Sequence, residues 1–227
     1  MSDKMYFYER FADEFDSKMN MYDTNKRLQV FYNELLTEDI SGRELLDAGC
    51  GTGWFSKWAC DRKANVTSMD LGEGLLKRVA MKCDSTRVVG SILDIPFADN
   101  TFDIVVSSEV IEHTPDPKKA VSELFRVLKP GGTLVLSVPN KFWYFSIWIA
   151  NKLHLRPYDG YENWLGWYEL KRSLTSNGFR IIRIQGIHLF PFVFGFLNPV
   201  LDFFHQFNKP LGPVMLNIAV KCIKPHN

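Results

Sequence analysis

Cysteine is scarce in this sequence of 227 residues, and no CxxC pair occurs among the four that it contains: Cys50, Cys60, Cys83 and Cys222. A disulfide-rich domain is therefore excluded, and we expect a chain that resides in a reducing compartment. The apolar stretch of a secretory signal is also missing from the opening residues, MSDKMYFYERFADEFD. Both absences favour a cytoplasmic protein.

A strong net charge is absent too, since 27 basic and 26 acidic residues leave a formal charge of +1. This balance supplies no overall field that would attract a nucleic-acid backbone, so we expect no nucleic-acid partner. The charge is unevenly placed, however, because residues 180–227 carry five basic side chains and one acidic one. Hydrophobic residues make up 46% and charged residues 23%, which excludes the disordered, collagen-like and coiled-coil classes.

From residue 43 onward, short apolar runs alternate with helix-compatible stretches, and no internal repeat interrupts them. The pattern predicts strands at residues 44–49, 65–70, 87–92, 103–109, 133–139, 180–189 and 215–223. It predicts helices at residues 71–83, 116–128 and 168–179. This alternation is typical of an α/β domain whose parallel sheet lies between helices and binds ligands at the carboxyl ends of its strands. We expect one such domain over residues 1–227.

Residues 1–40 precede this alternation and predict two helices. In the first, phenylalanines recur every four residues, at Phe7, Phe11 and Phe15. The second is expected to begin at Asp23 or Thr24, either of which could cap it, and to present one apolar face.

Two apolar insertions, residues 141–166 and 189–213, also fit no helix-strand alternation. Phe142 to Leu155 could form a helix of about 21 Å, too short to cross a hydrocarbon core of roughly 30 Å. In the second insertion, Asn198 and Pro199 indicate the start of a helix with one aromatic face. The insertions could cover the sheet or a subunit interface, form the wall of an apolar acceptor pocket, or rest on a membrane surface.

A glycine-rich turn follows the first predicted strand, in the sequence Asp47-Ala48-Gly49-Cys50-Gly51-Thr52-Gly53. Such a turn lets a ligand approach the backbone closely at the start of a helix. A dinucleotide fingerprint would need glycine where Trp54 stands, and Asp47 would repel a pyrophosphate, so a nicotinamide-dependent oxidoreductase is disfavoured. The same carboxylate suits the ammonium group of S-adenosylmethionine. Asp70, at the end of the second strand, could accept both hydroxyls of a ribose.

Four motifs, in this order and spacing, resemble those of class I S-adenosylmethionine-dependent methyltransferases, and of their ubiquinone-biosynthesis-like group in particular: LLDAGCGTGWFS, MDLGEGLL, GSILDIPFADNTFDIVVSSEVIEH and LKPGGTLVLSVPN. The resemblance implies a Rossmann-like, seven-stranded, mostly parallel sheet with helices on both faces and a helical lid over residues 1–40. It implies S-adenosylmethionine as cofactor and S-adenosylhomocysteine as product. The cofactor-binding residues that it implies are Asp47, Gly49, Cys50, Gly51, Gly53, Asp70, Leu71, Ser91, Ile92, Leu93 and Ser107.

The segment EVIEH after the fourth strand places Glu109, Glu112 and His113 at positions i, i+3 and i+4, which would share one face of a helix. This set could bind a divalent metal ion. It resembles the metal-binding segment of ubiquinone-pathway O-methyltransferases, although similar strings occur in relatives without a metal. We favour the metal-free alternative, in which His113 is a catalytic base assisted by Glu112. The loop holding Tyr158, Tyr161, Glu162 and Trp164 is expected to cover the acceptor.

These observations predict methyl transfer from S-adenosylmethionine to a small acceptor, apolar or lipid-linked, with oxygen as the preferred atom. The alternatives are a non-catalytic protein that binds S-adenosylmethionine or a partner and, less favoured, the oxidoreductase. Peripheral contact with a membrane is a further expectation, and the sequence leaves the oligomeric state open.

Overall fold

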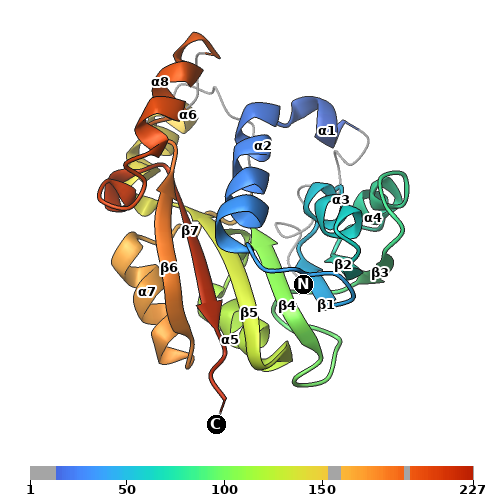
Figure 1. Cartoon of the computed structure of the whole chain (residues 1–227). Coiled ribbons are helices and arrows are strands. Elements are labelled where there is room, and N and C mark those ends of the chain that lie inside the picture. Colours follow the sequence, from blue (N-terminus) through green and yellow to red (C-terminus); the bar gives the residue numbers. More distant parts are fainter. Residues whose placement is uncertain (1–13, 153–159, 192–194, 227) are drawn as a thin grey trace.

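A seven-stranded sheet forms the centre of the computed structural model, which describes residues 14–152, 160–191 and 195–226 (Figure 1). Its strands are β1 Glu44–Ala48, β2 Asn65–Asp70, β3 Thr86–Val89, β4 Phe102–Ser108, β5 Leu128–Pro139, β6 Arg180–Ile187 and β7 Asn217–Ile223. They lie in the order β3-β2-β1-β4-β5-β7-β6, with β7 antiparallel to both of its neighbours and the other pairs parallel. The predicted fold class is confirmed.

Alternation of side chains along the strands divides the core between the two faces of the sheet. Leu45 in β1 belongs to a buried cluster with Phe31 and Phe55, whereas Leu46 belongs to the opposite cluster with Leu124. The first face is covered by α3 Trp54–Asp61 and the π-helix η3 Val30–Leu35, and the second by α5 Pro117–Val127 and α7 Trp167–Ser176. The remaining helix of the central region, α4 Glu73–Ala80, packs beside α3.

The N-terminal region begins with α1 Phe15–Lys18 and α2 Met21–Gln29, and α2 continues directly into η3. Figure 1 shows α2 crossing in front of the sheet. The predicted cap was wrong, because α2 is capped by Asn20, whose side chain accepts hydrogen bonds from the N–H groups of Tyr22 and Asp23. The Asp23 carboxylate pairs instead with Arg27, one turn later. Phe7 and Phe11 of the predicted first helix lie outside the described residues.

The two apolar insertions form short helices at one end of the molecule (Figure 1). The first contains the 3-10 turn η5 Lys141–Trp143 and α6 Tyr144–Lys152. The second contains the 3-10 turns η6 Gly195–Leu197 and η7 Gly212–Val214, with α8 Asn198–His205 between them. In the described part of the chain, no helix has both the length and the apolar character that crossing a membrane requires.

The carboxyl ends of β1, β2 and β4 meet where the order of the strands reverses. From β1 the chain adds β2 and β3 on one side, and then returns to place β4 on the other side. A crevice at such a switch point is where open α/β sheets bind their ligands. The short 3-10 turn η4 Ile111–His113 follows β4 at this edge, so it lies beside the turns that follow β1 and β2.

Candidate active site

A cavity of about 280 Å³ opens at this switch point, between the ends of β1, β2 and β4 and the N-terminal helices. Seven of the predicted cofactor residues line it: Asp47, Gly49, Cys50, Gly51, Asp70, Leu71 and Ile92. The fold therefore brings most of the predicted binding set together around a single cavity.

The turn after β1 depends on glycine at particular positions. Gly49 and Gly51 have positive φ angles of 80° and 53°, a backbone region that side chains disfavour. A Cβ atom on Gly49 would lie 2.4 Å from a methyl carbon of Val110, so no larger residue fits there. The N–H groups of Gly49 and Cys50 both donate to the Met69 carbonyl, which holds the turn against β2.

Asp47 places a carboxylate at the buried end of the cavity. The Ser56 hydroxyl donates to its Oδ2 at 2.6 Å and lies 2.7 Å from the Ser68 hydroxyl. Burial raises the pKa of Asp47 to about 7, against the hydrogen bond from Ser56, which lowers it. A cation placed against this carboxylate would restore its charged form.

Asp70, at the end of β2, fixes the loops on both sides of the cavity. Its Oδ2 accepts from the N–H of Gly51 at 2.9 Å, and its Oδ1 accepts from the N–H of Gly72 at 3.0 Å. Asp70 also lines the cavity, so its carboxylate faces the space that a ligand hydroxyl would occupy. Leu71 and Ile92 supply apolar surface nearby.

Four predicted cofactor residues lie outside the cavity lining, and each has a structural role instead. The backbone of Gly53 caps α3 with a φ of 89°. The Ser91 hydroxyl accepts from the N–H of Leu93, which closes a turn. The Ser107 hydroxyl donates to the Ala48 carbonyl and so ties β4 to the end of β1. Contact of these four residues with the cofactor stays a prediction, and the interactions of Gly53, Ser91 and Ser107 hold the turns and the sheet around the cavity.

The predicted metal triad does not form. Glu109 has a left-handed backbone, with φ of 56°, so it precedes the η4 turn instead of sharing its face with Glu112 and His113. Its two carboxylate oxygens accept hydrogen bonds from Ser137 and Asn217, at 2.8 and 2.9 Å. Among the residues that the structure describes, no three His, Cys, Asp or Glu side chains are grouped to hold a metal ion. The residues present therefore do not fit a metal.

Glu112 is buried beside His113 and does not line the cavity, and its role in assisting His113 stays a prediction. Its Oε1 lies 3.8 Å from Nε2 of His113, which is too long for a hydrogen bond. Burial, with the neighbouring Glu109 charge, holds the pKa of Glu112 well above its usual range. These surroundings therefore favour the protonated form of the Glu112 carboxyl.

His113 lines the cavity and has the tautomer that a base requires. Its Nδ1 lies 3.0 Å from the backbone oxygen of Tyr161, and a carbonyl can only accept, so Nδ1 carries the proton of the neutral ring. Nε2 then holds the lone pair. The N–H of Asn163 donates to the Glu112 carbonyl at 2.8 Å, so residues 161–163 hold this turn in place. Tyr158 of the same predicted loop lies outside the described residues.

The sequence did not single out Arg27, which reaches the cavity from α2. Its guanidinium donates to Oδ2 of Asp23 through Nε at 2.9 Å and to the Ser108 hydroxyl through Nη1 at 2.8 Å. Burial opposes its charge, but the Asp23 and Glu109 carboxylates raise its pKa above the usual value. An Asp and an Arg four residues apart on a helix were the available signal, but that pattern more often marks an exposed ion pair.

Asp16 in α1 joins the N-terminal region to the cofactor turn. Its carboxylate accepts from the Thr52 hydroxyl and from Nε1 of Trp54, and it pairs with Lys82 at 2.6 Å. Thr52 and Trp54 line the cavity, as do Met19 and Asn20 that follow α1. The described part of the predicted lid therefore forms one wall of the site.

Comparison with known proteins agrees with this geometry. Residues 46–136 match a family model described as a methyltransferase domain. The chain is 31% identical over 163 residues to a probable S-adenosylmethionine-dependent methyltransferase of Mycolicibacterium smegmatis, covering 71% of this chain and 61% of that one. It is 32% identical over 167 residues to a ubiquinone biosynthesis O-methyltransferase of Psychrobacter arcticus, covering 67% and 65%. Residues 46–136 therefore carry a methyltransferase domain, of the class I S-adenosylmethionine-dependent kind that these relatives and the fold support.

Comparison with solved structures shows the same fold. An S-adenosylmethionine-dependent methyltransferase of Thermotoga maritima superposes with a TM-score of 0.72 at 18% identity, over 96% of this chain and 99% of that one. The chain spans less than two thirds of the length of the two curated relatives named above. A methyltransferase domain argues against the nicotinamide-dependent oxidoreductase.

The cavity residues fit the cofactor that the family implies. Asp47 offers a desolvated carboxylate for the ammonium group, and Asp70 offers acceptor oxygens for the ribose. Gly49 and Gly51 line the cavity with positive φ angles, and a turn without side chains suits close approach of a ligand to the backbone. Asp47, the glycine turn and Asp70 all line one cavity. The sequence predicted the same three parts as contacts for the methionine part and the ribose of the cofactor.

Proposed function

We propose that the protein transfers a methyl group from S-adenosylmethionine to an oxygen of a small acceptor whose remainder is apolar or lipid-linked. The observation that carries this proposal is one cavity in which Asp47, the glycine turn and Asp70 lead to His113. The first three suit the cofactor, and the last suits a proton acceptor beside it.

The chain's own residues hold the cofactor and shield it from water. Asp47 accepts from the ammonium group, and Asp70 accepts from the ribose hydroxyls. Met19 and Asn20 close the wall that faces the N-terminal helices. When bound, the cofactor supplies an electrophilic methyl group. Most of the acceleration in such a displacement comes from orientation and exclusion of water, so few side chains are obligatory.

His113 is the candidate base for an acceptor hydroxyl. Its Nε2 holds the lone pair, and the Tyr161 carbonyl fixes the ring orientation through Nδ1. Glu112, whose Oε1 lies 3.8 Å from Nε2, acts as a positioning residue for the ring. Arg27 and Ser108 add donors at the same end of the cavity. A polar end of this kind supports an acceptor with a hydroxyl head.

Support for an apolar remainder comes from outside the cavity. None of the described residues in 141–152 lines the cavity, and the apolar pocket wall remains one of the alternatives for this segment. Four of its aromatic side chains and one of α8 are exposed: Phe142, Tyr144, Phe145, Trp148 and Phe203. An acceptor with a polar head in the cavity and an apolar tail outside would use both surfaces.

Calorimetry with S-adenosylhomocysteine tests the cofactor assignment. We expect binding by the wild type and a ten- to hundredfold weaker affinity for Asp70→Ala, because losing a charged acceptor costs about 1.5 to 3 kcal/mol. Unchanged affinity in a folded Asp70→Ala protein would refute the ribose assignment.

A transfer assay tests the chemistry, with labelled S-adenosylmethionine and phenolic acceptors that carry or lack an isoprenoid tail. His113→Gln should lower the turnover rate by about a hundredfold and leave cofactor affinity unchanged. The matched control is His226→Gln, an exposed histidine near the C-terminus. Cofactor binding without transfer to any acceptor would favour the non-catalytic alternative.

A further inference from the structure

Large aromatic side chains are exposed together at one end of the molecule. We name this surface the aromatic end and define it by five residues: Phe142, Phe145, Trp148, Phe203 and Phe207. Their exposed fractions lie between 41% for Phe207 and 60% for Trp148. Each such side chain would gain about 1.5 to 3 kcal/mol from full burial, so a cluster of them marks a contact surface.

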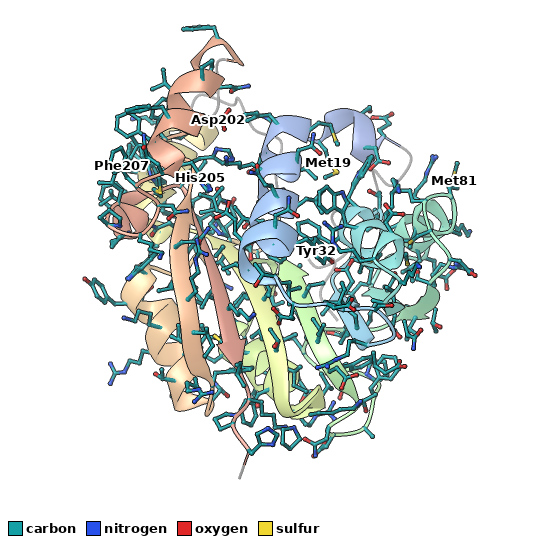
Figure 2. The ribbon with its side chains drawn as sticks, in the orientation of Figure 1. Met19, Tyr32, Met81, Asp202, His205 and Phe207 are labelled. Atoms are coloured by element: carbon teal, nitrogen blue, oxygen red, sulfur yellow. The ribbon has the colours of Figure 1, made fainter. Side chains whose placement is uncertain are left out.

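The two segments that carry the aromatic end are joined into one surface. Nε1 of Trp143 donates to the Val214 carbonyl at 2.8 Å, and Nδ2 of Asn140 donates to the Pro213 carbonyl at 3.0 Å. These bonds tie the start of the first segment to η7, which follows α8. Figure 1 shows α6 and α8 at the same end of the molecule, and Figure 2 shows Phe207 on its outer side. The aromatic end is therefore a continuous feature of the fold.

Positive charge accompanies the aromatic side chains. Lys152 and Lys209 are exposed, and Nζ of Lys152 lies 5.2 Å from the centre of the Trp148 ring. Segments 141–152 and 195–214 contain no arginine, and their one acidic residue is Asp202. Asp202 pairs with Lys26 at 3.3 Å and accepts from the Tyr22 hydroxyl, so its charge is compensated. The surface as a whole favours an anionic partner.

We propose that the aromatic end docks on an anionic lipid bilayer. Interfaces between proteins enrich arginine and deplete lysine, whereas bilayer surfaces attract lysine and take aromatic side chains at the level of the head groups. Stable attachment to a membrane generally needs two signals, such as apolar insertion and a basic patch, and both are present here. The composition therefore favours lipid over a second protein.

The geometry relates this docking surface to the cavity. Lys26 and Tyr22 of α2 contact Asp202 of α8, and α2 also supplies Thr24 and Arg27 to the cavity wall. A bilayer against α8 would thus lie beside the helix that closes the site. This inference goes beyond the proposed function, because the docking needs neither cofactor nor acceptor.

Vesicle flotation tests the proposal on the full chain without cofactor. The wild type should float with vesicles of phosphatidylcholine and phosphatidylglycerol, and more weakly with phosphatidylcholine alone. Trp148→Ser and Phe203→Ser should each lower the partition coefficient about tenfold, and Lys152→Glu should lower it about fivefold on the anionic vesicles only. Met81→Ser is the control, because Met81 is 75% exposed and lies at the opposite side of the molecule (Figure 2).

Two outcomes would overturn the proposal. One is a wild type that stays in the soluble fraction with anionic vesicles. The other is a lipid-free dimer, measured by sedimentation, that becomes monomeric in Trp148→Ser and Phe203→Ser, since the surface would then be a subunit interface. Calorimetry with S-adenosylhomocysteine on the same preparations separates this failure from that of the proposed function, because cofactor binding and vesicle binding are measured independently.

Discussion

The cofactor region, residues 44–72, and the aromatic end depart from ordinary burial in opposite directions. In the first, the Asp47 carboxylate is buried, and burial raises its pKa to about 7. In the second, Trp148 and Phe203 remain 60% and 59% exposed, although they are among the most apolar side chains of the chain. Charged groups are rarely buried and large apolar clusters are rarely exposed, so both regions carry a free-energy cost that folding alone does not explain.

The difference teaches which kind of ligand each region fits. A desolvated carboxylate beside a glycine turn is complementary to a small cationic ligand that can reach the backbone. An exposed aromatic surface edged by lysine is complementary to an extended apolar and anionic partner.

The largest effect is expected at Gly49. Gly49→Ala places a Cβ atom against Val110 and strains a φ of 80°, so S-adenosylhomocysteine affinity should fall about a hundredfold. Gly42→Ala is the matched control, because Gly42 has a similar φ of 70° but no atom within 4 Å of the added Cβ. It should lose about 1 kcal/mol of stability and keep its affinity. Equal loss of affinity in both variants would show that backbone strain, and not space, is responsible.

A smaller, pH-dependent effect is expected at Asp47. Its pKa of about 7 lies above the usual value of 3.8, so the stability that the protonated form contributes is complete below about pH 4 and is lost as the pH rises through 7. Binding of an ammonium group needs the ionised form, so cofactor affinity should weaken up to about tenfold per pH unit below 7.

Calorimetry in two buffers of different ionisation enthalpy should detect proton release when S-adenosylhomocysteine binds at pH 7. Asp47→Asn should abolish this release, weaken binding at pH 8 and raise the free energy of unfolding there by up to roughly 4 kcal/mol. A variant that is less stable than the wild type at pH 8 would contradict the desolvation argument.

A still smaller effect is expected at Asp16, where burial opposes ionisation but Lys82 and the hydrogen bond from Thr52 hold the pKa below its usual value. Asp16→Ala removes the link between α1 and the cofactor turn, and cofactor affinity should fall about fivefold. Hydrogen exchange in residues 14–29 should be slowed by S-adenosylhomocysteine in the wild type and less so in the variant. Exchange that the ligand leaves unchanged would argue against a closing lid.

The smallest effect is expected on stability at the aromatic end. Phe203→Ser should change the free energy of unfolding by no more than about 0.5 kcal/mol, since Phe203 is already exposed. Phe31→Ala, in the core, should cost about 3 to 5 kcal/mol by chemical denaturation. A large loss of unfolding free energy in Phe203→Ser would show that the aromatic end is part of the core. Its exposed aromatic side chains would then no longer contrast with the buried charge of the cofactor region.

Sequence patterns located the strands closely but not the ends of every helix. The strand at residues 65–70 was predicted residue for residue, because a short run that is buried on both faces of a parallel sheet is bounded by polar residues at its two ends. The start of α2 was missed, since Asn20, Asp23 and Thr24 are all good caps and only the ion pair with Arg27 removes Asp23 from that role. The strand β5 begins at Leu128, five residues before its prediction, because pairing with β4 extends it.

The sequence by itself determined the fold class, the glycine turn and the two acids Asp47 and Asp70, because each depends on local spacing or on the end of a strand. Only the tertiary structure decided that Glu109 turns away from Glu112 and His113. Its backbone is left-handed, and its carboxylate accepts hydrogen bonds from Ser137 and Asn217, which lie on strands far away in the sequence. The position of Arg27 was likewise decided by packing of α2 across the sheet. Contacts between residues far apart in sequence leave no local pattern, so spacing alone could not predict them.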